Sequence, residues 1–146
     1  MKHVLLDTNI LVDRSFRQLP HDAPSLQVLR GCQLSIWQGY TTTWSLMTLM
    51  YLMDASRDPS GRRIWTKRQI VHEATSLLTF ITVVEAGNGS FNAGFTMAWS
   101  DWGDAVIYSI ANDHPLIEAI VTNDADFVKR TKKLPGIKAI APGDLL

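Results

Sequence analysis

The chain has 146 residues, which is enough for one domain with its own hydrophobic core. Hydrophobic residues make up 46% and charged residues 19% of the sequence, which excludes a disordered chain and is typical of a globular protein. The formal net charge is zero, so no global charge attracts nucleic acid, and the single cysteine, Cys32, excludes an internal disulfide and a cysteine-rich metal site.

Strands and helices are predicted to alternate along the chain. The aliphatic run Val4 to Leu6 indicates a buried strand over 2–6, and it is followed by polar residues of the types that begin helices. Apolar spacing then predicts, in order, helices at 9–16 and 25–37, a strand at 40–43, helices at 44–54 and 64–79, a strand at 80–84, a helix at 101–112, a strand at 118–121, a helix at 123–131 and a strand at 137–140. Loops are expected at 17–24, 56–61 and 86–94.

This alternation predicts a single α/β domain over 1–146 with a mainly parallel central sheet. In such sheets ligands bind outside the carboxyl ends of the strands. The sequence shows neither a secretory signal nor an apolar stretch long enough to span a bilayer, so we expect a cytoplasmic protein without membrane contacts.

Acidic residues stand where three of the predicted helices begin. Asp7 follows the first strand, and Asp124 follows the strand at 118–121. Asp101 and Asp104 open the helix between them and, three residues apart, share one face of it. Each acid could simply cap a helix, because aspartate is favoured at such positions and suits the helix dipole.

A parallel sheet would, however, bring Asp7 and Asp124 to one edge, with Asp104 above the same rim. Clustered carboxylates repel each other, and their pKa values rise unless a cation joins them. Oxygen ligands of this type suit Mg²⁺ or Mn²⁺, and such an ion can activate water and stabilise displacement at phosphorus. A metal site at this edge is therefore the alternative to helix capping.

Three motifs together resemble those of the PIN-domain family: LLDTNIL at 5–11, Asp104-Ala105 at a helix start, and VTNDADF at 121–127. Their order, their separations and the chain length all fit, so the resemblance covers essentially the whole sequence. It implies a three-layer α/β/α fold and a Mg²⁺- or Mn²⁺-dependent endoribonuclease, which in many bacterial members is the toxin of a toxin–antitoxin pair. RNA and an antitoxin-like protein are the partners that it implies.

The same resemblance assigns roles to particular residues. Asp7, Asp104 and Asp124 match the family's catalytic and metal-binding acids, and Thr8, Asn9 and Thr122 match the polar residues that support them. The family usually has a further glutamate on the helix after the second strand, and here Thr48 stands at that position.

The substitution at Thr48 leaves two interpretations open. Asp54, the nearest acid on that helix, lies about 120° away from the required face and about 9 Å along the axis, so Asp101 is the better candidate for the missing charge. Mg²⁺ needs only one or two protein carboxylates, which leaves catalysis possible. The alternative is a PIN-like module that binds RNA or protein with weakened or lost catalysis. An aspartyl-phosphate phosphatase with Asp7 as nucleophile is disfavoured, because Asn9 replaces the second acid of the usual Asp-x-Asp pattern.

Two basic runs hold 9 of the 14 basic residues, and each is either a solvated face or a contact for the RNA backbone. They comprise Arg57, Arg62, Arg63, Lys67 and Arg68 in the first, and Lys129, Arg130, Lys132 and Lys133 in the second. The helix at 44–54 is apolar nearly all round, which indicates either a central core helix or one covered by a partner such as a second copy in a homodimer. Trp99 and Trp102 flank Asp101 and could pack locally or stack on an unpaired base.

Overall fold

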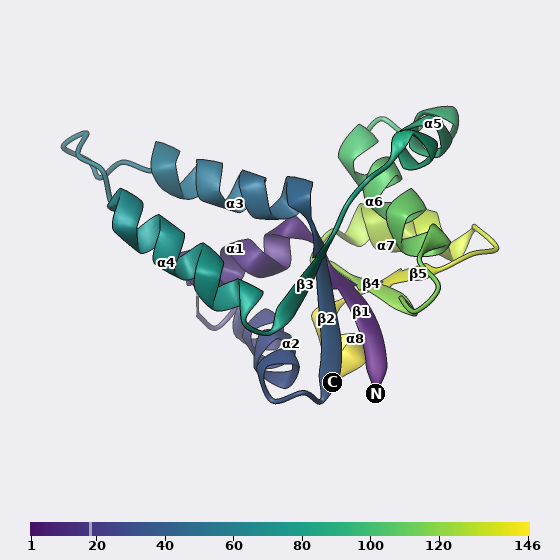
Figure 1. The fold of residues 1–146 in the computed structure, drawn as a ribbon, viewed down its shortest axis with the longest axis horizontal. Coiled ribbons are helices and arrows are strands. Elements are labelled where there is room, and N and C mark those ends of the chain that lie inside the picture. Colours follow the sequence, from purple (N-terminus) through teal and green to yellow (C-terminus); the bar gives the residue numbers. More distant parts are fainter. Residues whose placement is uncertain (18) are drawn as a thin grey trace.

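A five-stranded sheet forms the centre of the protein in a computed structural model that describes residues 1–17 and 19–146 (Figure 1). The helices and strands are β1 (Lys2–Leu6), α1 (Thr8–Phe16), α2 (Ala23–Gln33), β2 (Trp37–Thr42), α3 (Thr43–Ala55), α4 (Lys67–Leu78), β3 (Ile81–Val84), α5 (Asn88–Thr96), α6 (Trp102–Asp113), β4 (Ala119–Val121), α7 (Ala125–Lys132), β5 (Lys138–Ile140) and α8 (Pro142–Leu145). The strand order is β3-β2-β1-β4-β5, and all four neighbouring pairs are parallel, which confirms the predicted fold class.

Each face of the sheet has its own core, because successive side chains of β1 point to opposite sides. Val4 and Leu6 pack with buried residues of α1, α2, α3 and α4, whereas Leu5 packs with buried residues of α6 and α7. The helices therefore form two layers with the sheet between them. None of the helices in the described residues is long and apolar enough to cross a membrane.

The prediction of a loop at 86–94 is wrong, because most of this segment belongs to helix α5, Asn88–Thr96. Its glycines and asparagines carry low helix propensity, so the sequence pattern disfavours a helix there. Tertiary packing provides the missing stability: α5 lies so close to α6 that a Cβ added at Gly94 would be 3.0 Å from the backbone nitrogen of Val106. Gly94 is thus required by a close helix–helix approach.

The helix predicted at 25–37 is shorter and the strand that follows it is longer. Helix α2 ends at Gln33, Ser35 adopts a left-handed backbone with φ of 57°, and β2 begins at Trp37 instead of residue 40. The indole of Trp37 packs where a Cβ on Gly31 would lie, at 1.8 Å, so Gly31 serves packing inside the helix. The short helix α8 was not predicted, and the loop predicted at 17–24 includes Gln18, which lies outside the described residues.

Candidate active site at the carboxyl edge of the sheet

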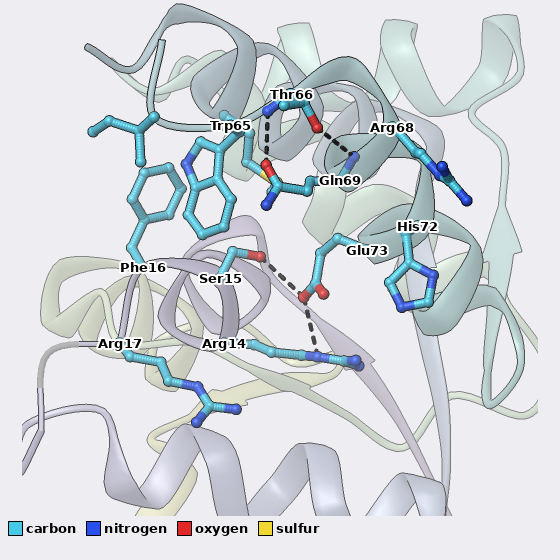
Figure 2. A pocket seen from close by; sticks show the side chains of 12 residues that line it. Arg14, Ser15, Phe16, Arg17, Trp65, Thr66, Arg68, Gln69, His72 and Glu73 are labelled. Atoms are coloured by element: carbon cyan, nitrogen blue, oxygen red, sulfur yellow. Dashed lines mark hydrogen bonds and ion pairs between the residues drawn. The ribbon is translucent and has the colours of Figure 1, made fainter. Parts of the chain in front are cut away.

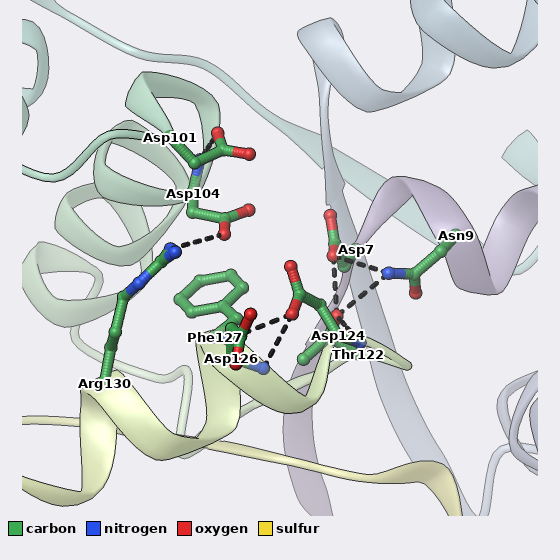
Figure 3. A network of polar contacts seen from close by, with 9 residues as sticks. All are labelled: Asp7, Asn9, Asp101, Asp104, Thr122, Asp124, Asp126, Phe127 and Arg130. Carbon is green, nitrogen blue, oxygen red and sulfur yellow. Dashed lines mark hydrogen bonds and ion pairs between the residues drawn. The ribbon is translucent and has the colours of Figure 1, made fainter.

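Strands β1 and β4 are neighbours in the sheet, and each ends in an acidic residue at the same edge. Asp7 follows β1 and caps α1, and Asp124 follows β4 and caps α7. Helix α6 begins above this edge and contributes Asp101 and Asp104 (Figure 3). The four acids predicted from the sequence therefore come from three helix starts that meet at one rim.

Asp7 is held by short hydrogen bonds to both carboxylate oxygens. Its Oδ1 accepts from the backbone N–H of Thr8 at 2.7 Å, and its Oδ2 accepts from Thr122 Oγ1 at 2.7 Å and Asn9 Nδ2 at 3.0 Å. Asn9 Nδ2 also donates to Thr122 Oγ1 at 3.0 Å, and that same oxygen accepts from the backbone N–H of Asp124. The three supporting residues predicted from the sequence thus fix the position of Asp7.

Asp124 and Asp101 combine helix capping with a place in the acidic cluster. Asp124 Oδ1 accepts from the backbone N–H groups of Asp126 and Phe127 at 2.8 and 3.1 Å, and Asp101 Oδ1 accepts from that of Asp104 at 3.0 Å. Each of these capping bonds uses Oδ1. The capping interpretation is therefore confirmed, and it is compatible with a place in the cluster, whereas the metal site stays a prediction.

Asp104 is buried, with 7% of its surface exposed, and Arg130 Nη1 lies 3.2 Å from its Oδ2. Burial, together with the negative charges of Asp101, Asp7 and Asp124, raises the pKa of Asp104 to about 7 against the opposing effect of Arg130. Burial also raises the pKa of Asp7, although its bonds from Thr122 and Thr8 work in the opposite direction. The four carboxylates of the cluster are thus close enough to interact electrostatically.

The cluster fits a hydrated divalent ion better than a fully protein-coordinated one. In the part of the chain that the structure describes, no three His, Cys, Asp or Glu side chains lie close enough to hold one ion together. The donors are all oxygens, and the pKa values of Asp7 and Asp104 are raised first by burial and then by the neighbouring negative charges, both of which a bound cation would offset. Mg²⁺ suits such a set because it keeps several of its waters and needs few carboxylates.

Comparison with known proteins gives matches in structure but not in sequence. No family model and no curated protein matches the chain. A toxin–antitoxin complex from Klebsiella pneumoniae matches with a TM-score of 0.64 and 18% identity over 95% of this chain and 97% of the other. VapBC2 from Rickettsia felis, bound to a DNA fragment from its promoter, matches with a TM-score of 0.64 and 16% identity over 95% and 98%. The sarcin–ricin loop cleaving toxin VapC20 from Mycobacterium tuberculosis matches with a TM-score of 0.61 and 14% identity over 87% and 94%.

The chain has a PIN-domain fold.

In the PIN fold of this chain, Ser45 joins the polar network although the sequence did not single it out. It is fully buried, and its Oγ accepts from Thr8 Oγ1 at 2.9 Å and from Thr42 Oγ1 at 3.0 Å. The sequence did contain an indication that Ser45 lies near the site, because it stands three residues before Thr48, on the helix where the resemblance places the family's usual glutamate. Thr48 itself is half-buried on α3, one turn beyond Ser45.

The two basic runs occupy different places on the PIN fold. Arg62 and Arg63 form ion pairs with Asp58 and Asp54 in the connection between α3 and α4. Because α3 has 13 residues, that connection lies about 20 Å along the helix from the acidic edge (Figure 1). The second run lies on and after α7, where Arg130 contacts Asp104 of the cluster. Lys129, Arg130 and Lys133 line a cavity of about 340 Å³.

Helix α3 is partly core and partly surface. Ser45, Leu49 and Met53 are buried, whereas Trp44 and Tyr51 are 66% and 70% exposed. The exposed side contributes Trp44 and Met47 to an apolar groove of about 620 Å³ that also contains side chains of α5 and α6. Whether a partner covers this face stays a prediction.

The two tryptophans beside Asp101 differ in their surroundings. Trp99 packs edge-to-face on Phe127 with ring centroids 5.9 Å apart, as the packing interpretation predicts. Trp102 is 71% exposed and lines the apolar groove on α3, α5 and α6.

A second cavity, of about 820 Å³, lies between α1 and α4 and contains none of the acidic-cluster residues (Figure 2). Within it Arg14 Nε lies 3.0 Å from Glu73 Oε1, and Ser15 Oγ donates to the same oxygen at 3.1 Å. Arg68, of the first basic run, lines this cavity rather than the acidic edge. This cavity is therefore separate from the acidic cluster.

Proposed function

We propose that this protein is a Mg²⁺- or Mn²⁺-dependent endoribonuclease that hydrolyses RNA phosphodiesters and acts in the cytoplasm as the toxin of a toxin–antitoxin pair. The observation that carries the proposal is the convergence of Asp7, Asp101, Asp104 and Asp124 at one sheet edge, with the pKa values of Asp7 and Asp104 raised. The likeness in fold to a sarcin–ricin loop cleaving toxin supports it.

The residues have separate tasks in this proposal. Asp7, Asp104 and Asp124 would hold a hydrated ion, in part through its water molecules, with Asp101 as an additional carboxylate. The ion when bound would supply an activated water and stabilise charge on the phosphate. Thr122 and Asn9 fix the Asp7 carboxylate through bonds of 2.7 and 3.0 Å, so that it stays aimed at the rim. Buried Asp104 also contacts the guanidinium of Arg130 on α7.

An antitoxin-like protein is the partner that we propose besides RNA. Neighbours in fold were solved as toxin–antitoxin complexes, two of them on DNA fragments. Co-purification of this protein with the product of an adjacent gene for a small DNA-binding protein tests the partnership. Cleavage that persists unchanged when that product is present in excess contradicts it.

The second candidate function is a binding module without catalysis. Thr48 favours it, because the residue provides no carboxylate where the family usually has one. Such a module would hold RNA or protein through its surface and would not need a divalent ion.

Incubation with single-stranded RNA separates the two candidates. A nuclease cuts RNA in Mn²⁺, stops in excess chelator and resumes when Mn²⁺ is restored. Because water is the attacking group, its products carry a phosphate on one new end and a hydroxyl on the other, with no 2′,3′-cyclic phosphate. A binding module retards RNA in a gel in the presence or absence of chelator and leaves it intact. Cutting that continues unchanged in chelator contradicts the metal-dependent mechanism.

A further inference from the structure

Arg130 is the basic side chain that the structure places against the acidic cluster. It extends from α7, and its Nη1 donates to Asp104 Oδ2 at 3.2 Å (Figure 3). Its guanidinium carbon also lies 5.6 Å from the centroid of the Trp99 ring, and Trp99 is itself held against Phe127 and Tyr108. The side chain is therefore supported from two sides while 30% of its surface remains exposed.

The contact with Asp104 leaves much of the guanidinium available. A guanidinium carries five N–H donors in a planar fork, and the bond to Asp104 uses Nη1. Arginine binds phosphate oxygens well because this fork matches their geometry and is weakly hydrated. Because the Arg130 guanidinium contacts buried Asp104 and also reaches solvent, it is suited to exchange the Asp104 carboxylate for a phosphate oxygen.

Arg130 also connects the acidic cluster with the rest of the basic side chains on α7. Lys129 and Lys133 line one cavity with Arg130 and Trp99. Lys133 lies three residues beyond Arg130 and hence close to the same side of the helix. A phosphate chain held by these lysines would pass Arg130 before it reached the carboxylates.

We propose that Arg130 is a substrate-binding residue of the acidic site, which pairs with Asp104 in the free protein and donates to a non-bridging oxygen of the phosphate that is cut. The inference rests on the proposed nuclease function. It has a second consequence, because the guanidinium and a divalent ion both compensate the charge of Asp104. Removal of Arg130 should therefore strengthen binding of the ion while weakening the handling of RNA.

Two variants and a matched control test the proposal. Arg130→Gln removes the charge, and Arg130→Lys keeps the charge but loses the planar fork. The control is Arg14→Gln, because Arg14 makes the same kinds of contact elsewhere: Nε lies 3.0 Å from Glu73 and the guanidinium lies 5.4 Å from the Phe80 ring. Both native arginines are partly exposed, at 23% for Arg14 and 30% for Arg130.

Three measurements follow on each protein: the melting temperature as Mn²⁺ is added, the cleavage rate on single-stranded RNA, and the salt dependence of RNA binding in chelator. For Arg130→Gln we expect the Mn²⁺ concentration at half-maximal stabilisation to fall about fivefold, which corresponds to about 1 kcal/mol for a partly exposed charge pair. Cleavage should slow by about a hundredfold, the lower end of the effect of removing one donor to a developing charge. The slope of log affinity against log salt should fall by about 0.7.

The controls distinguish this role from simple packing. Arg130→Lys should keep the Mn²⁺ midpoint of the wild type and lose most of the cleavage rate, whereas Arg14→Gln should lower the melting temperature and leave the other readouts unchanged. If Arg130→Gln matches the wild type in Mn²⁺ midpoint and cleavage rate, the inference is overturned while the nuclease function stands. A wild-type protein that cuts no RNA in Mn²⁺ overturns the proposed function and, with it, the substrate role of Arg130.

Discussion

Asp104→Asn should stabilise the protein at alkaline pH in the presence of chelator, although it removes an acid from the proposed active site. Burial and the charges of Asp101, Asp7 and Asp124 raise the pKa of Asp104 from 3.8 to about 7. The folded state therefore keeps a proton that the unfolded chain releases between these pH values. Stability contributed by that proton is present below the unfolded pKa and is lost as pH rises through about 7.

The size of the effect follows from the two pKa values. A shift from 3.8 to about 7 corresponds to at most about 4 kcal/mol. Solvent and salt reach this rim, so we expect about 1–2 kcal/mol after screening. In a domain of this size that amounts to about 3–6 °C in melting temperature. Asparagine has the same shape and retains an oxygen that can accept from Arg130, which limits other effects.

Thermal unfolding in chelator, followed by circular dichroism, measures this difference in stability between Asp104→Asn and the wild type. The measurement is made at about pH 4 and about pH 8, on either side of most of the range over which Asp104 titrates. Asp104→Asn should melt several degrees above the wild type at the higher pH and close to it at the lower pH. The matched control is Asp113→Asn, at the exposed far end of the same helix, which should show little dependence on pH. An Asp104→Asn variant that melts below the wild type at the higher pH would refute the account of charge repulsion at this rim.

Three further changes test other parts of the account. Changing Lys129, Lys132 and Lys133 to glutamine should weaken RNA binding in a filter-binding assay. The slope of log affinity against log salt should fall by about 0.7 for each lost phosphate contact, and an unchanged slope would mean that these lysines only face solvent. Thr48→Glu should lower the melting temperature in chelator and enlarge the rise caused by Mn²⁺, through about fivefold tighter metal binding; equal rises would show that Thr48 does not face the cluster. Gly94→Ala should destabilise the protein by about 1–3 kcal/mol in urea titration because its Cβ meets the backbone of α6, whereas Gly89→Ala, with open space around it, should not. Equal stability of the two alanine variants would contradict the close packing of α5 and α6.

The meeting of Asp7 and Asp124 was predictable because it depends on the parallel sheet alone, whereas the place of Asp101 and Asp104 depends on how α6 packs. Asp7 and Asp124 each end a strand, and two parallel neighbours necessarily end at the same edge. The capping bonds of Asp101 and Asp124 were equally readable, since they join residues two or three positions apart. What the local pattern did not decide was whether these acids only cap helices or also form a site, and the structure shows that capping leaves them within the acidic cluster.

Other features depend on contacts between distant segments and so left weaker signals. Arg130 and Asp104 are 26 residues apart, and nothing in the basic run distinguishes Arg130 from its lysine neighbours. Helix α5 was missed because its stability comes from packing on α6, which its glycines permit, rather than from its own propensity. Ser45 is buried by the fold around it, although its spacing from Thr48 was visible in the sequence.

The central claim is that the acidic edge of the sheet cuts RNA with a divalent ion, and the most direct test is the cleavage rate of Asp7→Asn in Mn²⁺. Asp7 is the acid most firmly held, through bonds from Thr8, Asn9 and Thr122. Asparagine keeps the shape and one acceptor oxygen, which can retain the bonds from Asn9 and Thr122 but loses the one from Thr8, so circular dichroism should first confirm that the variant is folded. The account predicts a wild-type protein that cuts single-stranded RNA, an Asp113→Asn control that cuts at the same rate, and an Asp7→Asn variant slower by about a hundredfold or more. A folded Asp7→Asn protein that cuts at the wild-type rate would contradict it.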